Sequence, residues 1–451
     1  MHATQLTGLD TAFLCLDGPS APMTIGAVVI FVPTEANHPT RLVQLLRERS
    51  QAIPRLRRKI QTNLFSLGGV RWVEDPDFQV SQHIHAHRLG TRELPELAAD
   101  IMARRLEMDR PLWELHLITG LPHGRFALLA KLHHALADGA AAIMLSLGLL
   151  DGFTPGEPEP EPAGPGLFGR LTNIPEQVRR VKKTADITAD ITGAVLRNAR
   201  PLDPYSPLRA APSTERTLAT VRLPVADIKQ VRAVHGGTAN DVLLAVLSGA
   251  LRDYLADRGH LVDRLTPRAL VPVNQRRRDA VPSSGNQLSG YLCDLPVNEE
   301  DPAQRLASVR AAMDANKAAG PFRGPGALPL IADQVPALVH RLTAPLVARS
   351  ANLLFDTVIT NVALPSVPLH FAGARLAEIY PMLPIAHGHA LGIALCTYQD
   401  HVHIGLYANA SALPDVDQLR DAIPQALAAL TGNRSSAAST SADVLPRAMT
   451  R

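Results

Sequence analysis

The stretch that most constrains the fold is rich in proline and glycine and lies before the middle of the chain. Residues 154–169 read TPGEPEPEPAGPGLFG. This segment cannot contribute to a packed core, because it consists of proline and glycine with acidic residues between them. At 451 residues the chain is also too long for one ordinary core. We therefore predict two folded halves joined by one long linker.

Strand-like and helix-like segments follow one another on both sides of this stretch. The run MTIGAVVIF (23–31) is rich in β-branched residues and bounded by proline and glycine, which is typical of a strand. A second series begins near Ala219, and RLAEIYPM (375–382) within it also resembles a strand. The series closes with the amphipathic segment PDVDQLRDAIPQALAAL. These patterns predict an α/β (α+β) fold for each half.

The predicted domain boundaries follow the changes in composition. The N-terminal domain spans 1–153, the linker with a crossover helix spans 154–215, and the C-terminal domain spans 216–432. The tail 433–451 is predicted to be disordered. Within the linker, segment 171–200 carries an apolar stripe with arginine and lysine beside it. Such a helix fits either a bilayer surface or a crossover packed on the two domains.

The overall composition excludes some classes of protein. Hydrophobic residues make up 46% and charged residues 19%, which is typical of a globular protein. The net charge of +3 argues against a nucleic-acid binder, because such a protein needs a concentrated basic face. The basic stretches RLRRK (55–59) and RVKK (180–183) are either anion or membrane contacts or solvated surface.

The cysteines and the absence of leader patterns point to a compartment. Cys15, Cys293 and Cys396 are far apart and odd in number, which fits a reducing environment rather than a disulfide framework. The first residues lack the basic and apolar regions of a signal peptide. No stretch reaches the roughly 18 apolar residues of a spanning helix. We expect a cytoplasmic protein that is soluble or attached to a membrane surface.

Two adjacent histidines stand at the end of an apolar run. LWELHLITGL and RFALLAKLHHA are predicted to form a strand pair around the turn PHG. Because neighbouring side chains of a strand alternate, His133 and His134 face opposite ways and do not readily bind one metal. One is expected inside and the other in a cavity. A histidine beside a sharp turn suits a general base, since its pKa lies near neutral.

The residues after the histidines are assigned structural roles. Asp138 caps the helix predicted to start at Gly139, or it pairs with a buried arginine, for which Arg276 is a candidate. Gly139 permits a tight turn or a close approach of the chain. In HIHAH, His83, His85 and His87 have the period of one strand face. They are either a metal site or surface and hydrogen-bonded core residues.

Motifs of other enzyme classes are missing from the sequence. It has no GxSxG elbow, no GxxxxGK[ST] loop and no HExxH helix. A GxGxxG match falls inside the proline-rich linker, where it does not follow a strand, and this argues against a dinucleotide site. Hydrolysis through an acyl-serine and nucleotide binding are therefore unsupported.

The segment PLWELHLITGLPHGRFALLAKLHHALADGAAA (111–142) resembles the signature of the bacterial wax ester synthase/diacylglycerol acyltransferases. These belong to the HHxxxDG acyltransferase superfamily, with chloramphenicol acetyltransferase and peptide-synthetase condensation domains. LTGLDTAFLCLDGPSAPMTIGAV, NDVLLAVLSGALRDYL and LPDVDQLRDA also fit, so the resemblance covers nearly the whole chain. It implies two chloramphenicol-acetyltransferase-like domains, each a mixed sheet with helices, with the active site at their interface.

The resemblance also implies an activity and its site residues. The protein is expected to transfer an acyl group from acyl-CoA to diacylglycerol or a long-chain alcohol, with acyl-CoA as a substrate and no cofactor or metal. His134 deprotonates the acceptor hydroxyl in a ternary complex and returns the proton to the CoA thiolate, while His133 stays buried. Asn240, in the Asn240-Asp241 motif, either donates to the oxyanion or belongs to a helix N-cap. The protein is expected to contact the inner membrane or lipid droplets, and it is not expected to bind nucleic acid.

Two departures from the family pattern leave the acceptor open. TNVALPSVPLHFAG (360–373) stands where members usually show Asn-Val-Pro-Gly-Pro, and TYQDHVHIGLYAN (397–409) has Gln-Asp where Tyr-Gly is commoner. Both lie in the second domain, near the expected acceptor pocket. A glycolipid, a polyketide or an amine is therefore an alternative acceptor. A non-catalytic lipid-binding or droplet protein, anchored by 171–200, is the alternative from another class.

Overall fold

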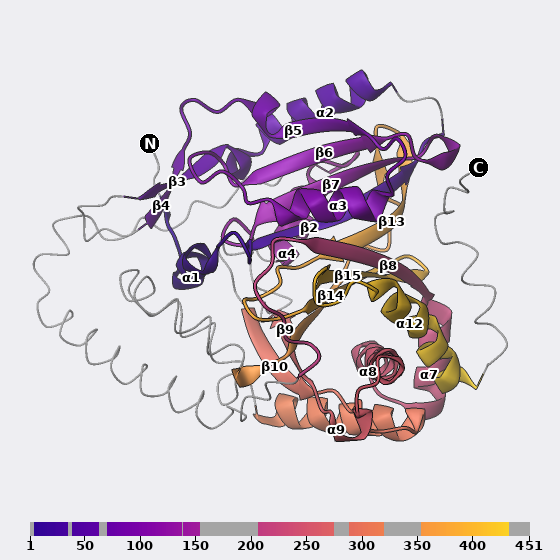
Figure 1. Ribbon diagram of the computed structural model, residues 1–451. Helices are drawn as coiled ribbons and strands as arrows, with labels where there is room; N and C mark the ends of the chain where they lie inside the picture. The colour runs from indigo at the N-terminus through magenta and orange to yellow at the C-terminus, as the bar shows by residue number, and fades with distance from the viewer. Residues whose placement is uncertain are drawn as a thin grey trace, which may run out of the picture.

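A computed structural model describes residues 4–34, 38–62, 70–137, 139–153, 206–274, 288–319 and 353–432. These residues form two six-stranded sheets and one three-stranded sheet, with helices packed against them (Figure 1). Several predictions from the sequence lie outside the described residues: the helix 171–200, the GxGxxG match, Arg276, Asp138 and the tail 433–451.

Strands and helices alternate in the half of the chain before the linker. The strands are β1 (Thr4–Gln5), β2 (Thr24–Val32), β3 (Arg58–Thr62), β4 (Val70–Glu74), β5 (Ile84–Arg88), β6 (Trp113–Thr119) and β7 (Phe126–His133). The helices are α1 (Gly8–Leu16), α2 (Pro39–Ala52), α3 (Leu94–Ala103) and α4 (Gly139–Leu147). The predicted strand pair around PHG is confirmed, because β6 and β7 pair antiparallel.

The half of the chain after the linker contains longer helices. Its strands are β8 (Arg216–Pro224), β9 (Arg268–Asn274), β10 (Leu288–Asp294), β11 (Thr357–Ala363), β12 (His370–Phe371), β13 (Ala374–Met382), β14 (Leu391–Tyr398) and β15 (His401–Asn409). The helices are α7 (Val225–His235), α8 (Ala239–Asp257), α9 (Pro302–Ala319) and α12 (Val416–Thr431). The predicted closing helix corresponds to α12.

The sheet of the N-terminal half has the strand order β12-β13-β2-β7-β6-β5. It is mixed, because β5 runs parallel to β6 while the other neighbours are antiparallel. Its strands β12 and β13 come from late in the chain (Figure 1). The sequence placed all of 216–432 in the C-terminal domain, whereas β13 pairs with β2 from Arg375 to Met382. Strand β13, from the half after the linker, thus joins the N-terminal sheet, where it pairs with the edge of β2 that β7 leaves open.

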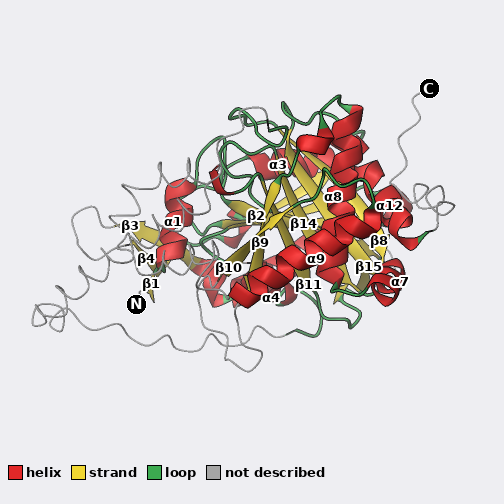
Figure 2. Cartoon of the chain, turned by 90° about the horizontal axis from the view of Figure 1, so that it is seen from below, coloured by secondary structure: helices red, strands yellow, loops and turns green. Residues whose placement is uncertain are grey.

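The sheet of the C-terminal half has the strand order β10-β9-β11-β14-β15-β8. It is also mixed, since β11 runs parallel to both β9 and β14. Helices α8, α9 and α12 pack against one another over this sheet (Figure 2). Helix α8 is buried at every position from Asp241 to Leu251, which is typical of a core helix. Among the described helices, none combines the length and apolar character needed to cross a membrane.

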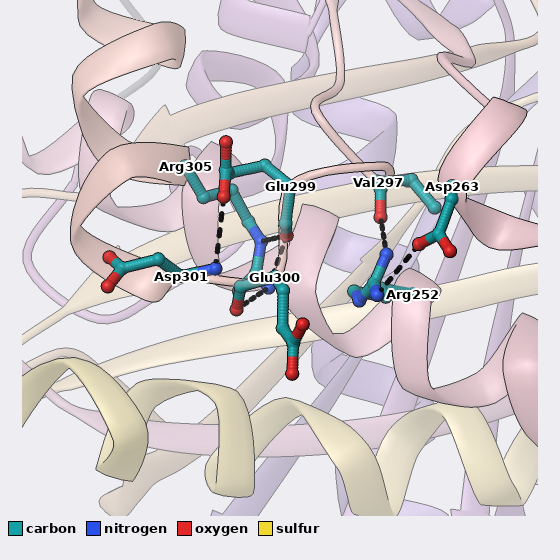
Figure 3. Close-up of polar contacts among 7 residues, drawn as sticks. All are labelled: Arg252, Asp263, Val297, Glu299, Glu300, Asp301 and Arg305. Carbon is teal, nitrogen blue, oxygen red and sulfur yellow. Dashed lines mark hydrogen bonds and ion pairs between the residues drawn. The ribbon is translucent and has the colours of Figure 1, made fainter.

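Two arginines hold the loop between β10 and α9 (Figure 3). Arg252 of α8 donates to the carbonyl of Val297 (2.9 Å). Arg305 of α9, which is 5% exposed, donates to the carbonyls of Glu299 (2.8 Å) and Glu300 (3.1 Å). These contacts satisfy carbonyls of the loop, among them that of buried Val297, and tie the loop to α8 and α9.

The two halves meet where β13 crosses β15. A Cβ atom added to Gly405 of β15 would lie 2.0 Å from the carbonyl oxygen of Pro381 in β13. Beside this crossing, Ala98 and Met102 of α3 share a core cluster with Leu218 of β8. The halves therefore touch through backbone and apolar side chains, and the cavity described next lies along this junction.

Candidate active site

A cavity of about 720 Å³ lies between the two six-stranded sheets. Its walls come from both halves of the chain and are almost entirely apolar. Among the described residues, the polar side chains in its wall are those of His134, Ser146, Thr360, Asn361 and His387, with the thiol of Cys396. An apolar cavity with few polar groups suits an apolar ligand whose reacting group is placed at one point.

His134 lies in the cavity wall, directly after the end of β7. The imidazole stacks on the ring of Phe13 from α1, with 4.0 Å between the ring centroids and 18° between the planes. The backbone N–H of His134 donates to the carbonyl of Met23 (2.7 Å). The ring is therefore held on one face while it lines the cavity.

His133 faces away from the cavity and is 1% exposed. The backbone N–H of Ala135 donates to its Nδ1 (3.0 Å), so in the neutral ring the proton resides on Nε2. That nitrogen lies 3.8 Å from Oδ1 of Asp17. Burial lowers the pKa of His133 to about 4, although Asp17 acts in the opposite direction. His133 is therefore neutral near pH 7 and holds the turn that follows it.

Acid is expected to destabilise this protein between about pH 6.5 and 4. Burial lowers the pKa of His133 to about 4 and that of His403 to about 3, from 6.5. In this range the unfolded chain binds more protons than the folded chain, so the stability present above pH 6.5 is lost as the pH falls. Urea unfolding at several pH values gives the free energy of unfolding, and its change per pH unit is the slope to be compared. His403→Phe should reduce it by up to about 1.4 kcal/mol per pH unit; equal slopes for variant and wild type would contradict the assignment.

The loop before β2 is bound to the histidine turn through Asp17. Its side chain is 2% exposed and accepts the backbone N–H of Met23 (2.8 Å) at Oδ1. Oδ2 accepts Nε of Arg105 (2.8 Å). In the sequence this loop contributed only to the family resemblance, and no role was predicted for Asp17, Phe13 or Arg105. The only indication of such roles in the sequence was that an aspartate and an aromatic residue stand in a mostly apolar opening segment.

Arg55 holds the histidine turn from the opposite direction. Its Nε and one terminal nitrogen donate to the carbonyl of Leu136, at 2.8 and 2.6 Å. The side chain comes from RLRRK, for which anion contacts or solvated surface were predicted. For Arg55 the solvated-surface interpretation is wrong, since its guanidinium reaches the turn that carries His134. The rigid, planar guanidinium can aim two N–H donors at this one carbonyl oxygen, which lysine cannot reproduce.

Replacing Arg55 with lysine is expected to lower kcat by about 10- to 100-fold, because displacement of a reacting group by about 1 Å has effects of that size. Lysine retains the charge but not the two-pronged contact with Leu136. The substitution Arg58→Ala, in the same basic stretch, is the control, since Arg58 contacts Thr4 rather than the turn. Steady-state kinetics of both variants make the comparison, and equal kcat values would contradict a positioning role for Arg55.

Gly139 lies where it was predicted, at the first position of α4 and in the cavity wall. A Cβ added there would lie 3.6 Å from Cγ1 of Val362, so the turn faces β11 of the other half. Asp138 lies outside the described residues, and its pairing or capping role stays a prediction.

Asn240 is the second residue of α8 and is half-buried. It is not among the described residues that line the cavity. The helix is capped by its neighbours, because Thr238 accepts the N–H of Asp241 and the Asp241 carboxylate accepts the N–H of Thr238. The capping interpretation is thus observed for Asp241, and an oxyanion role for Asn240 stays a prediction.

Two polar residues of β11 line the cavity, although the sequence predicted no role in the site for either of them. Thr360 and Asn361 begin the first segment that departs from the family pattern, and residues 360–364 all line the cavity. The second departure, Gln399-Asp400, forms the turn between β14 and β15 and is not part of the described wall. Only the first departure therefore reaches the cavity directly.

The histidines of HIHAH lie on and beside β5, away from the cavity. Nδ1 of buried His83 is 2.8 Å from the carbonyl of Trp113. Nε2 of His87 is 3.0 Å from Nδ1 of His116, and the ring of His85 stacks on His116. Over the described ranges, no group of three His, Cys, Asp or Glu residues could hold a metal ion. These contacts fit the hydrogen-bonded interpretation.

Comparison with known families gives two matches on this chain. The wax ester synthase/diacylglycerol acyltransferase catalytic domain matches residues 6–243. The C-terminal domain of the same family matches residues 284–431. The two matches include cavity-lining segments of both halves, and Leu270 and Pro272 of the wall lie between the matched ranges.

Individual relatives agree with these matches. A probable diacylglycerol O-acyltransferase of Mycobacterium tuberculosis is 32% identical over 447 residues, which cover 94% of this chain and 95% of the relative. The wax ester synthase/diacylglycerol acyltransferase of Marinobacter aquaeolei is 26% identical, with a TM-score of 0.70 and coverage of 96% and 100%. A trichothecene 15-O-acetyltransferase of Fusarium sporotrichioides, 13% identical with a TM-score of 0.62 and coverage of 95% and 94%, shares the fold. The predicted two-domain fold is confirmed by these structures.

Proposed function

The chain belongs to the wax ester synthase/diacylglycerol acyltransferase family, and we propose that this acyltransferase moves an acyl group from acyl-CoA to the hydroxyl of diacylglycerol or a long-chain alcohol. The observation that supports this most is the position of His134. Its imidazole lies in a cavity wall that is nearly apolar and that is formed by both halves of the chain. Both proposed substrates have long apolar chains and one reacting group.

In the proposed mechanism His134 acts as general base within a ternary complex. It takes the proton of the acceptor hydroxyl as the oxygen forms a bond to the thioester carbonyl carbon. The carbon–sulfur bond then breaks, and His134 returns the proton to the CoA thiolate. Stacking on Phe13 and the backbone contact to Met23 restrict how far the imidazole can move between these steps.

The tetrahedral intermediate requires a donor for its oxyanion. Asn240 is the donor predicted from the Asn-Asp motif. Thr360 and Asn361 are alternatives that the cavity supports, because both line its wall. Kinetics of Asn240→Ala, Thr360→Val and Asn361→Ala separate the three candidates, since loss of the true donor lowers kcat more than it raises KM.

The substrates suggest where the protein works. We propose a cytoplasmic enzyme that contacts the inner membrane or lipid droplets peripherally. In support, Met144 of α4 is 64% exposed, while Ile143 and Ser146 of the same helix line the cavity. An exposed apolar side chain of α4 therefore lies beside residues of the cavity wall. Flotation of the protein with phosphatidylglycerol vesicles tests this contact, and recovery of all protein in the unbound fraction would argue against it.

A CoA-release assay tests the proposed activity. Purified protein with palmitoyl-CoA is combined in separate reactions with diolein, hexadecanol, short alcohols, a glycolipid, a polyketide or an amine, and free thiol and acylated product are measured together. The expected result is stoichiometric release of CoA and formation of triacylglycerol or wax ester. Release only with a glycolipid, polyketide or amine would identify the alternative acceptor. Vesicle binding without turnover on any acceptor would support the non-catalytic lipid-binding alternative.

A further inference from the structure

One arm of the cavity runs along β2, away from the histidines. Thr24 of β2 pairs with His133, so this strand starts beside the histidine turn. Alternate residues of β2 then line the cavity, from Ile25 to Phe31. Six residue steps in a strand span about 20 Å. The arm is therefore long enough for an extended alkyl chain whose reacting end lies near His134.

Beyond the pair Ile25–Leu132, which lies nearest to the histidine turn, the side chains along this arm increase in size with distance from His134. They form three rows across the paired strands β13, β2 and β7. From near to far, the rows are Pro381–Ala27–Ala130, Ile379–Val29–Leu128 and Leu376–Phe31–Phe126. The small residues of the first row leave open space, and the aromatic residues of the last row fill it. No side chain in these rows is polar, so an alkyl chain is the chemistry that the arm recognises.

Three phenylalanine rings pack together at the far end of the arm. Phe31 is fully buried, and its ring centroid lies 5.3 Å from that of Phe126 and 5.8 Å from that of Phe371. The guanidinium of Arg49 lies over the outer ring, 5.4 Å from the centroid of Phe371. His387, which lines the cavity beyond the Met382 end of β13, is exposed. The phenylalanine row lies at the opposite end of β13, where Leu376 pairs with Phe31.

We propose that this arm measures the length of one saturated alkyl chain and that Phe31 sets the longest chain the enzyme accepts. This rests on the proposed function, in which the chain is either the acyl group of acyl-CoA or the alkyl group of the acceptor. A longer chain meets rings that are packed on two sides and cannot move without strain. Each methylene beyond the phenylalanine row is expected to reduce kcat/KM by about tenfold or more.

Two opposite substitutions test the proposal. Phe31→Ala removes the ring at the end of the arm and so lengthens the space for the chain. It should raise kcat/KM for docosanoyl-CoA relative to palmitoyl-CoA by about tenfold. Val29→Phe places a ring one row, or about 7 Å, nearer to His134 and should shift the optimum towards decanoyl-CoA. Phe78→Ala is the control, because Phe78 packs on His83 and Trp113 and is not in the described wall. Its length profile should match that of wild type.

The source of the chain is found by varying one substrate at a time. Acyl-CoA length is varied with diolein held constant, and alcohol length is varied with palmitoyl-CoA held constant. A shift in the first series alone assigns the arm to the donor, and a shift in the second series alone assigns it to the acceptor. Unchanged profiles for both Phe31→Ala and Val29→Phe would overturn the proposal while leaving the acyltransferase activity established.

The proposal can also be tested without turnover. Calorimetric titration of wild type and both variants with fatty alcohols of increasing length measures binding alone. If Val29→Phe binds long alcohols more weakly than wild type and short alcohols equally well, the result supports a limit on chain length set by this arm. Equal length dependence in all three proteins refutes it. If no CoA is released by wild type, the proposed function fails, and this titration still decides whether the arm measures chain length.

Discussion

Replacing His134 with alanine is expected to lower kcat for CoA release by about 100- to 10,000-fold, the usual contribution of a general base. The imidazole is in the cavity wall and is held by the ring of Phe13. Because His134 is only half-buried, its loss should leave the urea midpoint close to that of wild type. Initial rates with palmitoyl-CoA and either diolein or hexadecanol measure the effect.

Two further histidine variants make this result specific. His38→Ala removes an exposed histidine that makes no side-chain capping hydrogen bond to the helix it precedes, and it should leave kcat unchanged. His133→Ala should lower both kcat and the urea midpoint, because His133 is buried and accepts the N–H of Ala135. If His134→Ala retains kcat within a small factor of wild type, another group must remove the proton.

Replacing Gly405 with alanine is expected to lower the free energy of unfolding by at least about 1–3 kcal/mol, the range for overpacking in a core. The added Cβ would lie 2.0 Å from the carbonyl oxygen of Pro381. Neither backbone can move freely, since Pro381 pairs with Ala27 in one sheet and Gly405 pairs with Ala394 in the other. Urea unfolding measures the loss. Because Pro381 also lines the cavity, kcat/KM should fall as well.

Gly18→Ala is the matched control for this substitution. A Cβ at Gly18 has no heavy atom within 4 Å, so alanine should be accepted there without strain. The expected pattern is a lowered midpoint for Gly405→Ala and an unchanged one for Gly18→Ala. Equal midpoints for both variants would mean that the crossing of β13 and β15 can open without a measurable effect on stability.

Local patterns in the sequence predicted much of the secondary structure. The strand pair β6 and β7, the helix from Gly139 and the closing helix α12 all appear in the structure. The opposite directions of His133 and His134 also follow from a local rule, since strand side chains alternate. Such features depend on residues a few positions apart, and their periodicity can be read directly. The family motif added the expectation of two acyltransferase domains, which related structures confirm.

Contacts between distant residues were decided only by the tertiary structure. The sequence placed β13 with the second domain, and no local pattern shows that it pairs with β2. Arg55 was interpreted as part of a surface patch, although its guanidinium reaches the carbonyl of Leu136. Asp17 received no role, although it joins Met23 and Arg105 beside the histidines. Polar groups reach these partners only after the chain has folded.

By itself, the sequence determined the type of chemistry: a histidine at the end of a strand, beside a glycine that starts a helix. The tertiary structure decided the shape of the space that this histidine faces. The three rows from Ala27 to Phe31 are assembled from strands on both sides of the linker, so their graded sizes are invisible along the chain. Side-chain identity is local, whereas the volume enclosed by side chains depends on which strands become neighbours.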